Sequence, residues 1–277
     1  MKILKYFIQF VIISTMFLIF KSIGLKLASI ISSKILSTFG PFFRSKNLIQ
    51  SNILKALPNF KQNEVEELSK KMWVNYGKIL SEYVFIKNFR NSKKNFNIDI
   101  IGQEILEEIK KNNEPVIFVS GHFNNFELMA MHIERSGINL AAIYRPLNNK
   151  FLNLIMEKIR KKYICKNQIK KGMSGTRELL NLFKKKFSVA LMIDQRVSEG
   201  EDVTLFNRVA KTTTIPAQLV KKYGCRVVPV YIERFKNYHF RLSFNKPLKF
   251  DDKLSIEQIS LELNEILEKM ILKNPDQ

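Results

Sequence analysis

Apolar runs rich in β-branched residues recur beyond residue 98, and each predicts a buried strand. The predicted strands are 115–120, 139–144, 188–193, 226–232 and 239–245. Between and after them, apolar residues recur at helical spacing, which predicts helices over 102–112, 125–136, 149–162, 174–186, 214–223 and 254–272. Strands that alternate with helices of this length predict an α/β fold, with a mostly parallel sheet flanked by helices.

The N-terminal part of the chain has a different pattern. Residues 6–20 carry no charge, and a second apolar stretch over 25–39 is interrupted by Lys26 and Lys34. No A-x-A cleavage pattern follows the first run, which argues against a removed signal peptide. We expect permanent membrane attachment, by a short tilted span or by an in-plane anchor. The chain therefore divides into an N-terminal membrane-anchoring helix, 1–40, and a body, 41–277, that opens with a helix over 62–88.

Charge changes this picture, because 46 Lys and Arg face 25 Asp and Glu, for a net charge of +21. Such a charge attracts nucleic acid, an anionic membrane surface or an acidic carrier protein. No helix-turn-helix or zinc-finger pattern accompanies it, so we expect no nucleic-acid partner. Cys165 and Cys225 stand far apart, outside any metal-ligand spacing, and are predicted to be buried reduced thiols.

Polar residues follow three of the predicted strands. His122 comes just after the first strand, Arg145 after the second, and Asp194 with Gln195 after the third. The carboxyl ends of parallel strands meet at one edge of a sheet, where ligands bind. Three polar clusters on one edge predict an active site.

His122 and Glu127, five positions apart, are the candidate catalytic pair. A histidine oriented by a carboxylate is the usual general base near neutral pH. Asn124 or Asn125 is a candidate helix cap that would let His122 fold back towards Glu127. Alternatively, Glu127 only complements the helix dipole and His122 is a turn residue. Arg145 is either a ligand for a phosphate or an oxyanion, or a surface arginine.

Motifs for nucleotide and metal chemistry are missing from the sequence. It contains no Walker loop, no G-x-G-x-x-G, no G-x-S-x-G and no H-E-x-x-H. His132 and His239 show no metal-ligand spacing. We therefore expect neither a metal nor a nucleotide cofactor.

In order along the chain, these residues resemble the motifs of the lipid A biosynthesis acyltransferases, the late lauroyl and myristoyl transferases of Gram-negative bacteria. Residues 121–127 look like the H-x4-D/E motif in its glutamate form. Tyr144-Arg145-Pro146 and Asp194-Gln195 are similar to later blocks. Residues 205–217 resemble the phenylalanine-glycine block and the Thr-x-x-Pro-Ala helix start, with Asn207 where glycine is usual. The resemblance covers nearly the whole chain.

The resemblance implies a glycerolipid acyltransferase-like fold, within the lysophospholipid acyltransferase-like superfamily, with 41–277 as the acyltransferase domain. It also implies transfer of a fatty acyl chain from acyl-carrier protein, as co-substrate, to a hydroxyl of an anionic, Kdo-bearing lipid A precursor at the cytoplasmic face of the inner membrane. His122 would be the general base, and Glu127 would set its tautomer. The residues implied in substrate binding or pocket shape are Arg145, Asp194, Gln195 and Asn125.

Two other functions stay open on the sequence. One is a related acyltransferase acting on a lysophospholipid or a glycolipid. The phosphatidic-acid branch usually carries an F-P-E-G-T-R-like block, whereas residues 171–177 read Lys-Gly-Met-Ser-Gly-Thr-Arg. The other is a non-catalytic basic protein that binds a membrane or another anion. It predicts that a variant lacking both His122 and Glu127 binds as before and that acyl transfer is never seen.

Overall fold

The chain forms two compact units. The structure is a computed structural model that describes residues 2–91, 97–198, 200–236 and 238–277. One unit comprises Met1–Lys87 with Ile271–Gln277, and the other comprises Asn88–Met270. The unit that holds the predicted anchor thus extends through Lys87, and the division at residue 40 stays a prediction.

The first unit is helical. It contains α1 (Lys2–Phe39), the short 3-10 helix η1 (Gly40–Phe42), α2 (Lys46–Ala56) and α3 (Gln62–Val84), and α4 (Ile86–Arg90) follows at the boundary. The helix expected over 62–88 is present as α3. By length and composition alone, Lys2–Phe42 could cross a membrane. However, α1 is interrupted at Gly24, where the backbone is not helical.

Within the described residues, the second unit is built on a seven-stranded sheet. Its order is β1-β9-β8-β2-β5-β3-β4. The strands are β1 (Ile98–Ile101), β2 (Ile117–Ser120), β3 (Leu140–Tyr144), β4 (Asn167–Lys170), β5 (Ser188–Met192), β8 (Val227–Lys236) and β9 (His239–Phe244). All neighbouring pairs are parallel except β8 with β9. The predicted mostly parallel sheet is confirmed.

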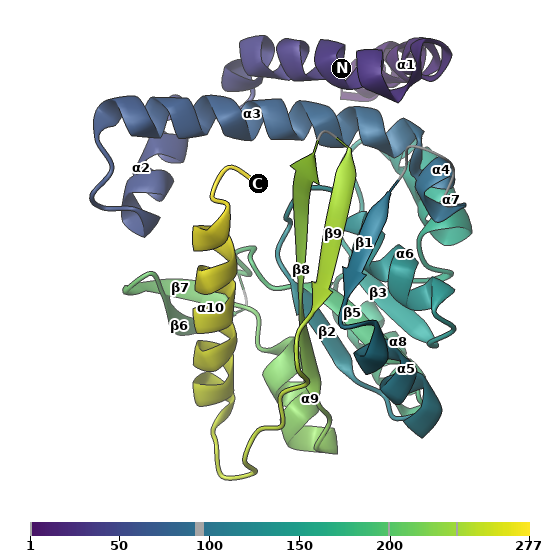
Figure 1. Cartoon of the computed structure of the whole chain (residues 1–277), viewed down its shortest axis with the longest axis vertical. Coiled ribbons are helices and arrows are strands. Elements are labelled where there is room, and N and C mark those ends of the chain that lie inside the picture. Colours follow the sequence, from purple (N-terminus) through teal and green to yellow (C-terminus); the bar gives the residue numbers. More distant parts are fainter. Residues whose placement is uncertain (1, 92–96, 199, 237) are drawn as a thin grey trace. The chain divides into compact units, whose positions relative to one another are not determined.

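The helices of this unit follow the strands, as expected. They are α5 (Gln103–Asn112), α6 (Glu127–Arg135), α7 (Lys150–Tyr163), α8 (Met173–Lys184), α9 (Ile215–Tyr223) and α10 (Ile256–Lys273). Helices α5, α6 and α8 gather on one side of the sheet, and α10 lies on the other (Figure 1). The predicted helices are confirmed, with bounds that differ by a few residues at their ends.

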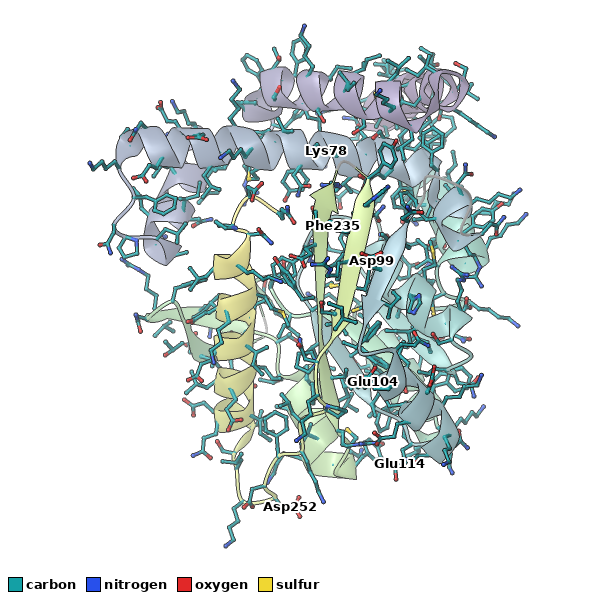
Figure 2. The ribbon with its side chains drawn as sticks, viewed as in Figure 1. Lys78, Asp99, Glu104, Glu114, Phe235 and Asp252 are labelled. Carbon is teal, nitrogen blue, oxygen red and sulfur yellow. The ribbon has the colours of Figure 1, made fainter. Side chains whose placement is uncertain are left out.

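Parallel strands place the site at one edge of the sheet. β2, β3, β4, β5 and β8 share one direction, so their carboxyl ends meet. Figure 2 shows Glu114 and Asp252 at the end where β2 and β8 begin, and Phe235 near the end where β8 finishes. The three polar clusters of the sequence follow β2, β3 and β5, which are direct neighbours. They therefore share the carboxyl edge, as predicted.

A two-stranded hairpin that the sequence did not predict follows β5. β6 (Glu201–Leu205) and β7 (Arg208–Thr212) pair in antiparallel register across Phe206 and Asn207. Both loop residues have positive φ, 50° and 56°. A two-residue hairpin loop of this kind favours asparagine or glycine. Asn207 thus adopts the left-handed conformation that the glycine usual at this position would allow.

The sheet carries the core of the second unit. Ile117 and Phe118 of β2 are fully buried, since helices cover both faces of a parallel sheet. Cys165 and Cys225 are free and buried, as predicted. Burial raises the pKa of each thiol to about 12, so both stay protonated near neutral pH.

Candidate functional site

His122 is held by Asp194, from the neighbouring strand. β2 and β5 are paired so that Ser120 lies level with Met192, and two residues further on His122 lies level with Asp194. His122 Nδ1 lies 2.7 Å from Asp194 Oδ1, and the backbone N–H of His122 donates to Oδ2 at 2.9 Å. A carboxylate only accepts hydrogen bonds, so Nδ1 carries the proton in this pair.

In the structure the carboxylate partner of His122 is Asp194, and not Glu127 as expected. No hydrogen bond joins His122 to Glu127, both of which the structure describes. Instead, Glu127 Oε1 accepts from Nε and Nη2 of Arg160 at 2.7 and 2.6 Å. The carboxylate begins α6, whereas the imidazole precedes it in a turn, and that turn aims His122 at β5. Arg160, near the end of α7, is a site residue that the sequence reasoning missed.

The turn between β2 and α6 is pinned to β8 by Asn124. Its backbone has a positive φ of 46°, a conformation that asparagine tolerates better than most residues. Its side chain donates to the carbonyl of Ile232 at 3.2 Å and accepts from Arg234 Nη1 at 2.9 Å. The predicted capping role of Asn124 or Asn125 is wrong, because α6 begins after Phe126 without a side-chain cap. Asn124 instead fixes the loop that presents His122.

A cavity of about 390 Å³ opens beside His122. Ala142 of β3 and Ala190 of β5 lie directly opposite each other in the sheet, so their small side chains share one face. Ala130 of α6 is a third small side chain in this part of the lining. The ring of Phe126 packs edge-on to the imidazole, with centroids 4.6 Å apart. The cavity therefore joins an apolar interior to the imidazole of His122.

Two cations lie level with each other at the cavity edge. Tyr144 and Lys170 are paired in the β3–β4 register, so Arg145 and Lys171 are the next residues on adjacent strands. Both are exposed, and both line the cavity. No ion pair is found for either within the described part of the chain. Their charge is therefore available to an anionic group.

Arg160 occupies the cavity lining between Glu127 and Tyr144. Its guanidinium lies 5.5 Å from the centre of the Tyr144 ring. The Tyr144 hydroxyl donates to Glu157 Oε1 at 2.6 Å. Burial, together with this bond to a carboxylate, raises the pKa of Tyr144, and the same bond lowers the pKa of Glu157. Tyr144 is therefore a neutral hydrogen-bond donor that links the end of β3 to α7 beside the cavity.

The remaining predicted site residues divide into two groups. Gln195 lines the cavity, and its Nε2 lies 3.4 Å from Nε2 of His122. Asp194 binds His122 and is not among the residues that line the cavity. Asn125 is 1% exposed and is also outside that lining, so the structure does not place it against a substrate. Within the described ranges, no three His, Cys, Asp or Glu side chains cluster to hold a metal ion.

Comparisons with known proteins agree on a family. The model of the bacterial lipid A biosynthesis acyltransferases matches residues 1–277. The chain is 24% identical over 185 residues to the lipid A biosynthesis myristoyltransferase of Escherichia coli (strain K12), covering 65% of this chain and 56% of the relative. It is also 24% identical over 181 residues to lipid A biosynthesis acyltransferase 1 of Shigella flexneri, covering 64% and 55%. The matched part thus spans little more than half of these relatives.

Among solved structures, the crystal structure of the 1-acyl-sn-glycerophosphate acyltransferase PlsC from Thermotoga maritima resembles this chain with a TM-score of 0.44 and 12% identity, over 92% of this chain and 99% of PlsC. The family match, by contrast, extends over every residue of the sequence. On that ground, this chain belongs to the bacterial lipid A biosynthesis acyltransferase family.

Proposed function

We propose that this chain is a membrane-bound acyltransferase that moves a fatty acyl group from an acyl-carrier-protein thioester to a hydroxyl of a lipid A precursor. The observation that carries the proposal is the His122–Asp194 hydrogen bond of 2.7 Å beside a cavity with an apolar interior. Membership of the family supports the class of reaction.

His122 is the general base in this reaction. Asp194 holds the proton on Nδ1, which leaves the lone pair of Nε2 to take the hydroxyl proton of the acceptor. The acceptor oxygen then attacks the thioester carbonyl carbon. The C–S bond breaks as the tetrahedral intermediate collapses, and the imidazolium returns its proton to the departing thiolate. Asp194 stabilises the imidazolium between these two steps.

Polar groups at the cavity edge stabilise negative charge on the substrates. Gln195 is close enough to His122 for its amide to reach the carbonyl oxygen that becomes an oxyanion. Arg145 and Lys171 bind an anionic group of the acceptor or of the carrier arm. Glu127 acts indirectly, since it positions Arg160 in the same lining.

The apolar interior accepts the fatty chain. Ala130, Ala142 and Ala190 leave space that larger side chains would fill, and Met129 and Phe126 add apolar surface.

The charge and the N-terminal helix support the proposed location at the cytoplasmic face of the inner membrane. A net charge of +21 attracts an acidic carrier protein and the anionic leaflet. Attachment through α1 would keep the enzyme beside a lipid acceptor.

The test is His122→Ala in the full chain, assayed in membranes with acyl-carrier-protein donor and lipid A precursor. Product masses report transfer directly. We expect a loss of at least 100-fold with the fold and membrane association unchanged, since a positioned general base contributes roughly 10² to 10⁴ in rate. His239→Ala is the matched control, because His239 lies on β9 outside the cavity lining. Near-normal transfer by His122→Ala would end the proposal.

A further inference from the structure

The break in α1 is caused by the backbone conformation of a single glycine, Gly24. Gly24 has φ 80° and ψ 164°, a region open essentially to glycine alone. An added Cβ would meet nothing within 4 Å, so the restriction lies in the backbone and not in crowding. Residues 2–23 and 25–39 are therefore two helices, roughly 33 and 22 Å long at 1.5 Å per residue.

The two halves of α1 fold back along each other. Phe20 and Ala28, either side of the bend, are 1% and 0% exposed. Further out, an apolar cavity of about 390 Å³ is lined by both halves, with Met16 facing it from the first and Ile31 from the second. Met16 and Ile31 lie at nearly equal distances along the chain from Gly24. The halves therefore diverge at a narrow angle, like an open hairpin.

The second half is fastened to α3. Ser32 donates to the carbonyl of Gly77 at 2.7 Å, and Ser33 donates to the carbonyl of Val74 at 3.2 Å. The helices touch closely here, since a Cβ on Gly77 would lie 2.5 Å from the carbonyl oxygen of Ser32. The second half of α1 must therefore lie wherever α3 lies.

The surface of α3 is too strongly charged for the hydrocarbon core of a membrane. Its first turns carry exposed charged side chains: Glu64, Glu66, Glu67, Lys70 and Lys71. Charged groups inside the hydrocarbon are strongly disfavoured, so α3 stays outside it. This places the second half of α1 at the membrane surface.

The exposed residues of α1 fit a surface position. Large apolar side chains are exposed on both halves, for example Leu18 at 70% and Ile30 at 58%. Lys21 and Lys26 flank the bend and are exposed. A bend driven into the bilayer core would take both ammonium groups with it, whereas a bend at the headgroups pairs them with anionic lipid.

We propose that α1 is a folded in-plane anchor, in which both halves lie in one leaflet of an anionic membrane. Their apolar faces meet the acyl chains and the lysines meet the headgroups. Residue 3 therefore stays on the same side of the membrane as α3. This inference rests on the proposed membrane attachment and fixes its geometry.

The test uses single cysteines in the full chain, Ile3→Cys near the start of α1 and Asn63→Cys at the exposed start of α3. A membrane-impermeant maleimide is applied to sealed inside-out and right-side-out vesicles; Cys165 and Cys225 are buried and serve as the unlabelled background. Both new cysteines should be labelled in the same vesicle orientation, to within twofold. Labelling of Ile3→Cys only from the opposite side, or only after detergent, would overturn the in-plane anchor.

The same experiment separates this inference from the function. An Ile3→Cys label on the opposite side leaves a membrane-bound acyltransferase with a spanning helix. Recovery of the chain in the soluble fraction would remove the membrane attachment and the anchor together. Gly24→Ala should straighten α1 and cut same-side labelling of Ile3→Cys several-fold, whereas Ser22→Ala, an exposed helical control, should not. Unchanged labelling in Gly24→Ala would contradict the role of Gly24.

Discussion

Asp194→Asn is the sharpest probe of the site, because the two carboxylate oxygens have separate tasks. One accepts from the imidazole Nδ1 and the other from the backbone N–H of His122. Asparagine has a single acceptor oxygen, so it can satisfy only one of these donors. If its amide NH₂ faces the ring, Nδ1 must accept and the proton moves to Nε2. His122 then holds the tautomer that cannot take a proton from the acceptor hydroxyl.

The size of the effect follows from this geometry. A hydrogen bond to a charged group is worth roughly 1.5–3 kcal/mol, and about 1.4 kcal/mol is tenfold in rate, so losing the charge alone lowers kcat by about 10- to 150-fold. The side chains of His122 and Asp194 are 31% and 23% exposed, so solvent reduces but does not remove this term. A change of tautomer extends the loss to as much as about 10⁴-fold, the scale of the same exchange in a Ser-His-Asp triad.

The assay separates orientation from binding. Steady-state transfer to the lipid A precursor, read by product mass, should show a lower kcat with KM changed less than threefold. Asp202→Asn is the control, since Asp202 pairs with Lys211 on the β6–β7 hairpin. A kcat for Asp194→Asn within twofold of the original chain, alongside a stable but inactive Glu127→Gln, would refute the pairing described here and return that task to Glu127.

Three further predictions test other parts of the second unit. Glu127→Gln should lower the free energy of unfolding by up to about 3–5 kcal/mol, because it removes the carboxylate charge beside the partly buried Arg160 guanidinium, and Glu127→Gln with Arg160→Met should recover most of the loss in thermal denaturation. Burial, aided by the nearby Arg135, lowers the pKa of His132 to about 4, so its contribution to stability is complete above pH 6.5 and falls by up to roughly 3 kcal/mol as the pH drops to 4; urea unfolding across that range should be flatter for His132→Gln. Ala142→Val should shift the products to shorter acyl chains and Ala142→Gly should not, because the added methyl groups enter the cavity; unchanged product masses would place the acyl chain elsewhere.

The pattern of apolar residues alone was enough to predict the buried strands and the helices of the second unit. β2 is buried at every position, so its apolar run is continuous and easily recognised. The helices around it show the 3.6-residue pattern that one buried face imposes. The positions of His122, Arg145 and Asp194 just after such runs were sufficient to predict a shared edge.

The strands that escaped prediction are those with the weakest reason to be apolar. β1 and β4 are the two edges of the sheet, and β4 reads Asn-Gln-Ile-Lys with only Ile169 buried. The β6–β7 hairpin is also largely exposed. A half-solvated strand has no continuous apolar run, so its sequence resembles that of a loop.

The pairing of the candidate catalytic side chains depended on tertiary structure and could not be predicted from the local sequence. Proximity along the chain favoured Glu127 as the partner of His122, yet Asp194, 72 positions away, holds the imidazole. The parallel register of β2 with β5 decides this, because it sets the two strand ends level. Glu127 pairs with Arg160 for the same kind of reason, since α6 contacts β3, α7 contacts β4, and these strands are neighbours in the sheet. Local sequence specifies which residues end a strand, whereas the order of strands in the sheet specifies which of those residues meet.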